Sequence, residues 1–124
     1  MHRSTLLTSF KYAFSGMWHV LRTQRNARIH LSLALVVIVL GLWLGLSRIE
    51  WAIIVLTIGL VLAAESFNTV AEAAVDLATA EYHPLAKIAK DVAAGAVLLM
   101  AITAVVVGLL ILGPPLWAAL LTMF

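Results

Sequence analysis

The chain has 124 residues, of which 64% are hydrophobic and only 11% are charged; its formal net charge is +2 and its mean hydropathy is +1.09. Soluble domains are about half apolar and about a quarter charged, and a domain of this size buries only about two-thirds of its surface on folding. These values exclude a soluble monomer, a disordered tail and a nucleic-acid-binding module, and they predict a single all-α membrane domain over residues 1–124.

Residues 4–24 are predicted to form an amphipathic helix that lies on the membrane surface. At 100° per residue, the apolar side chains between Leu6 and Leu21 gather on one face. The opposite face carries Lys11, Ser15, His19 and Arg22. A helix with one apolar and one polar face is typical of the membrane interface.

Three membrane-spanning helices are predicted to follow, at about 29–47, 50–78 and 85–112. The first lacks formal charge between Arg28 and Arg48, and as a helix it is about 28 Å long, one bilayer thickness. The second continues beyond its charge-free part, residues 51–64, because that part alone is too short to cross. The third begins near Pro84 and is expected to end at Gly113-Pro114-Pro115, with the apolar tail lying in the interface.

The distribution of basic residues predicts the orientation of these helices. Seven of the eight Lys and Arg residues precede the first span or follow the second, and only Arg48 lies on the other side of the membrane. The side with more Lys and Arg is normally cytoplasmic. We therefore expect the N-terminus in the cytoplasm, and the net positive charge needs no nucleic-acid partner.

The second span carries a row of polar residues, named here the polar stripe. On a helical wheel Asn68, Glu72 and Asp76 lie at about −60°, −20° and +20° from Glu65, so all four share an arc of about 80°. The helical rise places Glu65 inside the bilayer edge, Glu72 at the interface and Asp76 just beyond it. Polar groups at such depth are costly, which makes the polar stripe a candidate site.

The residue types of the stripe favour one kind of chemistry. Carboxylates and an amide are hard oxygen ligands that suit Mg²⁺, and the absence of cysteine excludes thiolate sites. Lys90, beside Asp91, can neutralise phosphate oxygens. A carboxylate in low-dielectric surroundings can act as a general base. Together they favour phosphoryl transfer from a magnesium-bound nucleotide to an alcohol in the membrane, although no Walker A or G-x-G-x-x-G sequence is present.

Other interpretations stay open at this point. Asp76, with Glu72, fits an ordinary solvated helix end, and Glu65 with Asn68 fits a structural hydrogen-bond network between helices. The whole chain could be a non-enzymatic membrane subunit that docks a partner through the stripe. A proton or ion pathway is disfavoured, because the interiors of the first and third spans have no ionisable residue and residues 51–64 are apolar.

Several segments resemble the small prokaryotic integral-membrane diacylglycerol kinase and undecaprenol kinase family. They are the E-x-x-N-[ST]-x-x-E-x-x-x-D block at 65–76, Glu81-Tyr82-His83, the Lys90-Asp91 segment at 86–97, residues 9–16 and Arg25-Asn26-Ala27-Arg28-Ile29-His30. The resemblance covers about residues 9–112, and the last segment is in the style of the undecaprenol kinase branch. It implies a surface helix plus three spans, a homotrimer in the bacterial inner membrane, and phosphorylation of a lipid hydroxyl by ATP and Mg²⁺ at cytoplasmic sites shared between subunits.

The resemblance also implies a role for each matched residue. Glu65 would be the catalytic base on the lipid hydroxyl, Arg28 would lie near the lipid, and Glu72 would ligate the metal. Asn68 and Asp76 would organise the polar stripe. The nucleotide and its metal would be bound by Tyr12, Gln24, Glu72, Glu81, Tyr82, His83, Lys90 and Asp91.

One position departs from the family pattern. The family usually has a second metal-binding Glu just before the Arg-Asn pair, where this chain has Gln24. An amide oxygen can ligate Mg²⁺ but carries no charge. The departure predicts weaker metal binding, a site that recruits another acid, or a slower member of the family.

Overall fold

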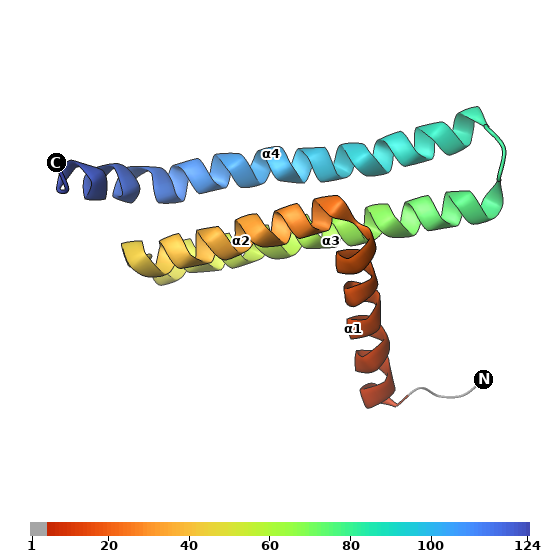
Figure 1. Ribbon diagram of the computed structural model, residues 1–124, viewed down its shortest axis with the longest axis horizontal. Helices are drawn as coiled ribbons and strands as arrows, with labels where there is room; N and C mark the ends of the chain where they lie inside the picture. The colour runs from red at the N-terminus through yellow and green to blue at the C-terminus, as the bar shows by residue number, and fades with distance from the viewer. Residues whose placement is uncertain (1–4) are drawn as a thin grey trace.

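The computed structural model describes residues 5–124, which form four α-helices (Figure 1). They are α1 (Leu6–Thr23), α2 (Arg25–Leu44), α3 (Arg48–Ala78) and α4 (Pro84–Leu121). α2, α3 and α4 lie alongside one another, whereas α1 lies across their direction at the start of α2 (Figure 1). The three long helices are each long and apolar enough to cross a membrane, which confirms the predicted all-α membrane class.

α1 begins where Thr5 caps it, with the Thr5 hydroxyl oxygen accepting a hydrogen bond from the Thr8 N–H at 3.3 Å. None of its residues is buried, and its large apolar side chains, including Phe10 and Trp18, are exposed. The helix therefore does not use its apolar face to pack on the rest of the chain. The predicted segment 4–24 agrees with these bounds, and Ser4 lies outside the described residues; its place on a membrane surface stays a prediction.

A tight turn joins α2 to α3. α2 ends at Gly45, whose φ of 71° is left-handed and favours glycine. α3 begins with a capping box, in which Ser47 and Glu50 exchange backbone-to-side-chain hydrogen bonds at 2.7 and 3.3 Å. A Cβ on Gly41 would meet the Trp51 ring at 2.8 Å. The turn thus fixes α2 and α3 as a closely packed antiparallel pair.

α3 and α4 are much longer than α2. At 1.5 Å per residue, α2 is about 30 Å long, α3 about 46 Å and α4 about 57 Å. Figure 1 shows that the C-terminal part of α3 and the N-terminal part of α4 continue together beyond the start of α2. We call these two segments the paired arm. The polar stripe therefore begins between three helices and ends on the arm.

The helix bounds differ from the predicted spans in two places. α2 begins at Arg25 rather than near residue 29, because its first turn is polar and lies before the apolar part from which the span was predicted. α4 continues through Pro114 and Pro115 to Leu121, so the expected end at these prolines is wrong. Two adjacent prolines remove two intrahelical hydrogen bonds, but their fixed φ is compatible with a helix.

Candidate functional site

Glu65 is the most deeply buried polar residue of the described chain. It lies on α3 and is 1% exposed, and its Oε1 atom has no hydrogen-bond partner among residues 5–124. The nearest charged or titratable neighbour is His30 of α2, whose Nε2 atom lies 3.4 Å from Oε1. Ala27 and Ala34 are buried on the same face of α2 as His30, and small side chains there allow α2 to cover the carboxylate.

Asn68 and Glu72 continue the stripe by one and two helical turns. The Asn68 amide donates a hydrogen bond of 3.3 Å from Nδ2 to Glu72 Oε1. Asn68 is 9% exposed, and its Oδ1 atom, like Glu65 Oε1, has no partner among the described residues. Glu72 is half-buried and Asp76 is exposed. Burial within the chain therefore decreases from Glu65 to Asp76, and the predicted depths in the bilayer stay a prediction.

The two unpaired atoms argue against a purely structural network. Buried polar atoms in folded proteins almost always have a partner, and a structural network satisfies its own members. Here Glu65 Oε1 and Asn68 Oδ1 are both acceptors, and they lie on neighbouring turns of one helix face. Only a cation or an O–H or N–H donor can satisfy these two acceptor oxygens. The site therefore suits a ligand that brings a hydroxyl or a positive charge.

Two ion pairs surround the outer end of the stripe. Lys90 of α4 donates to Asp76 Oδ1 at 2.6 Å, which joins the two helices of the paired arm. Lys87 pairs with Asp91 within α4. Lys90 thus pairs across the arm and not with its sequence neighbour Asp91. Both pairs are partly exposed and add little stability, so their main effect is to position an ammonium group beside the stripe.

The connection between α3 and α4 is exposed and internally hydrogen-bonded. Glu81 donates its N–H to the Thr79 hydroxyl at 3.2 Å, and His83 Nδ1 accepts from Leu85 N–H at 3.2 Å and so caps α4. Glu81, Tyr82 and His83 lie at the far end of the paired arm, away from α1 (Figure 1).

Tyr12 is exposed on α1, and within residues 5–124 α1 contacts α2 and α3 but not α4. One copy of the chain therefore does not gather Tyr12, the connection and the stripe into one site.

Gln24 lies at the junction of α1 and α2, where it ends one helix and begins the next. Its amide donates to the Thr23 hydroxyl at 3.4 Å, and no hydrogen bond joins it to Glu72 in the described chain. Residues 5–124 contain no group of three or more His, Cys, Asp or Glu side chains that could hold a metal. A metal here would need ligands from phosphate, water or a second copy of the chain.

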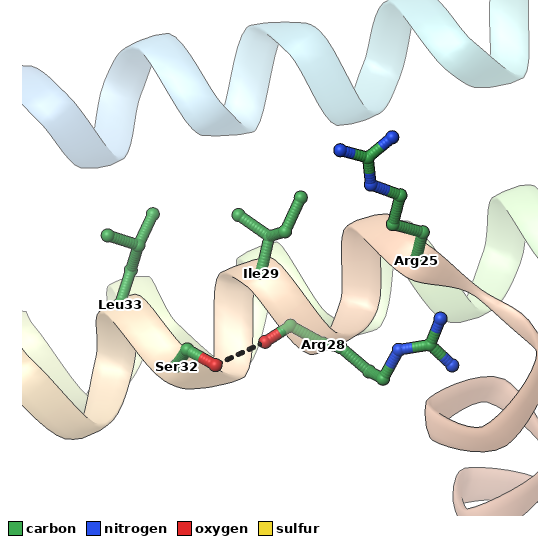
Figure 2. Close-up of a pocket in the computed structure, with 5 residues that line it drawn as sticks. All are labelled: Arg25, Arg28, Ile29, Ser32 and Leu33. Atoms are coloured by element: carbon green, nitrogen blue, oxygen red, sulfur yellow. Dashed lines mark hydrogen bonds between the residues drawn. The ribbon is translucent and has the colours of Figure 1, made fainter.

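Arg28 holds the corner between α1 and α2. Its Nη1 atom donates to the backbone carbonyls of Leu21 at 3.3 Å and Arg22 at 2.9 Å, which lie in the last turn of α1. A shallow hollow is lined by Arg25, Arg28, Ile29, Ser32 and Leu33. Figure 2 shows that the two guanidinium groups point away from each other, toward different helices. The hollow is therefore not a convergent anion site; the Arg28 side chain is held by α1, and its position near a lipid stays a prediction.

An apolar groove of about 420 Å³ lies between α2, α3 and α4. Its lining includes His30, Val61 and Leu62 at one end and Leu112 and Leu116 at the other. His30, which lines one end of the groove, also contacts Glu65, although Glu65 itself does not line the groove. The sequence analysis named His30 only within the matching segment 25–30 and gave it no role, although its spacing from Ala27 and Ala34 places it on the face that α2 turns to its neighbours.

The fold and the stripe define a small helical membrane protein with one buried acidic site between its spans. Comparison with known proteins then identifies its family, since the prokaryotic diacylglycerol kinase family matches residues 11–112. The chain belongs to this family and is a lipid kinase, and the family match favours an enzyme over a non-enzymatic subunit.

The named relatives do not share one substrate. An undecaprenol kinase of Bacillus subtilis is 46% identical over 93% of this chain and 96% of the relative. A diacylglycerol kinase of Synechocystis sp. is 51% identical over 90% of this chain, which spans only 64% of that relative. A diacylglycerol kinase of Escherichia coli is 36% identical over 58% of this chain and 59% of the relative.

The Arg28 hydrogen bonds predict that this side chain holds α1 against the start of α2, and limited digestion can test this role. Arg28→Gln should loosen the α1–α2 corner, because it removes two hydrogen bonds from a charged donor, and trypsin should then cut at Lys11 roughly two- to fivefold faster. Arg25→Gln is the matched control, because it removes one neighbouring arginine that makes no hydrogen bond or ion pair in the described chain. Equal cleavage at Lys11 in both variants would contradict the assignment.

Proposed function

We propose that the chain transfers the γ-phosphate of ATP to the hydroxyl of a membrane lipid, with Glu65 as the general base. The observation that carries this proposal is the pair of buried acceptor atoms, Glu65 Oε1 and Asn68 Oδ1, that have no hydrogen-bond partner among residues 5–124. A lipid hydroxyl is a donor that can reach Glu65 from the apolar groove. Because the surroundings exclude water, water does not compete with the lipid hydroxyl for the carboxylate.

The proposed step conserves atoms and protons. The Glu65 carboxylate takes the hydroxyl proton while the lipid oxygen attacks the γ-phosphorus. One phosphorus–oxygen bond forms, the bond to the ADP oxygen breaks, and Glu65 is left protonated. The general base supplies about 10²–10⁴-fold of the rate, and positioning of the two substrates supplies much of the rest.

Mg²⁺ fits the residues that we propose for it. Glu72 and Gln24 offer only oxygen ligands of the kind that Mg²⁺ prefers, and Mg²⁺ commonly completes its shell with water and substrate phosphates. Asn68 would hold the Glu72 carboxylate in place through its hydrogen bond. The bound ion would neutralise charge on the phosphates.

Nucleotide binding is proposed for the outer end of the site. Lys90, oriented by Asp76, would neutralise phosphate oxygens, and Asp91 lies on the next position of α4. Tyr12, Glu81, Tyr82 and His83 would contact the nucleotide, but α1 does not meet α4 within residues 5–124 of one copy. We therefore propose a homotrimer in which neighbouring copies complete each site.

The lipid would enter sideways from the bilayer. We propose that its apolar chain lies in the groove, that its hydroxyl reaches Glu65, and that Arg28 lies on the polar side of the headgroup. The excess of Lys and Arg supports a cytoplasmic N-terminus, in the bacterial inner membrane. We propose undecaprenol rather than diacylglycerol as the preferred substrate, because residues 25–30 resemble the undecaprenol kinase branch of the family. Labelled ATP with each lipid in mixed micelles tests this preference.

Removing the proposed base should abolish the reaction without unfolding the protein. Glu65→Gln keeps the size of the side chain, so label transfer from ATP to lipid should fall by roughly 10²-fold or more while the chain still inserts in membranes. Glu50→Gln is the matched control, because Glu50 lies at the other end of the same helix, in the capping box. Normal turnover in the Glu65 variant would disprove the proposal.

Restoring the usual carboxylate should strengthen metal binding. Gln24→Glu adds a negative charge to the proposed ligand set, and we expect the Mg²⁺ concentration for half-maximal activity to fall by roughly tenfold. Titration of activity with Mg²⁺ at saturating ATP measures the change. An unchanged or higher requirement for Mg²⁺ would show that residue 24 does not bind the metal.

A further inference from the structure

His30 is the side chain best placed to exchange a proton with Glu65. Its Nε2 atom lies 3.4 Å from Glu65 Oε1, the oxygen that has no hydrogen-bond partner among residues 5–124. The side chain of His30 is 18% exposed, whereas that of Glu65 is 2% exposed. The imidazole thus contacts the buried carboxylate and is itself more accessible, at one end of the groove between the helices.

The reaction proposed above creates a need for such a group. Each transfer leaves the hydroxyl proton on Glu65, and Glu65 can act again only after that proton leaves. Direct release to water is blocked, because the carboxylate is almost fully buried. Histidine is the side chain most suited to pass protons near neutral pH.

Within residues 5–124, the other charged groups at this end of the bundle do not contact the Glu65 carboxylate or the His30 imidazole through an ion pair or a side-chain hydrogen bond. These groups are Arg22 on α1, Arg25 and Arg28 on α2, Glu72 and Asp76 on α3, and Lys87, Lys90 and Asp91 on α4. Arg28, the nearest to His30 in sequence, donates instead to the carbonyls of α1.

We infer that His30 is a positioning residue that accepts the transferred proton from Glu65 and releases it to water. The O–H bond of the protonated Glu65 breaks and an N–H bond forms at His30 Nε2; the imidazolium then gives a proton to water. This inference rests on the proposed function of Glu65. His30 contacts the base and not the reacting atoms, so its loss should lower turnover more than it weakens binding of the lipid, whose chain it borders in the groove.

Steady-state kinetics of the full chain in mixed micelles tests the inference. In His30→Gln, which keeps a polar side chain but cannot carry a proton, kcat should fall about tenfold, less than the effect of losing the base itself. The KM for ATP should change less than about twofold, because no residue proposed for the nucleotide is altered, and the KM for lipid should change less than kcat does, because His30 is one of many residues that line the groove. His19→Gln, on exposed α1, is the matched control and should behave like the unmodified chain.

Chemical rescue separates a proton relay from a packing role. His30→Ala opens space beside Glu65, and added imidazole should restore kcat several-fold in a saturable way, while the same additive should not raise the rate of His30→Gln. Loss of activity without rescue would overturn the relay and leave a packing role. Full activity of both His30 variants, with Glu65→Gln inactive, would overturn the relay alone. An active Glu65→Gln would overturn the proposed function itself.

Discussion

The function proposed for this structure depends on the burial of one carboxylate, Glu65, among apolar helices. An unpaired buried acceptor is costly, and a buried charge is more costly still, so such a group persists only where the surrounding packing holds it. The packing here comes from small residues on α2, from the tight α2–α3 turn and from the pairing of α3 with α4. Leucine at this position would suit the apolar surroundings better, and the proposed role of Glu65 as a base accounts for an acid there.

Because α2 is shorter than α3 and α4, the polar stripe has a buried part beneath α2 and an exposed part on the paired arm. Where α2 covers α3, the surroundings are apolar, and His30 at one end of the groove contacts Glu65. Beyond the start of α2, only the paired arm continues, and it carries Glu72, Asp76 and Lys90 into more exposed positions. α1 lies across the helices at the boundary (Figure 1). A lipid alcohol and a phosphate donor could therefore approach the same stripe from opposite directions.

Much of this arrangement could be predicted from the sequence, because it depends on local periodicity. The stripe follows from the 100° rotation per residue, and the three spans follow from the apolar runs. The contact between His30 and Glu65 could not be predicted, because it depends on how α2 is aligned along α3. The choice of Asp76 over Asp91 as the partner of Lys90 likewise depends on the pairing of two helices. Pro114 and Pro115 misled the prediction because a helix can continue through adjacent prolines.

The most direct test of the central claim is to locate the lipid hydroxyl. A lipid alcohol that carries a photoreactive diazirine beside its hydroxyl can be cross-linked to the chain in mixed micelles and mapped by mass spectrometry. The account predicts labelling of the α2 and α3 segments around His30 and Glu65, and competition by the unmodified lipid. Labelling confined to other segments, such as the C-terminal part of α4, or labelling that does not saturate, would contradict it.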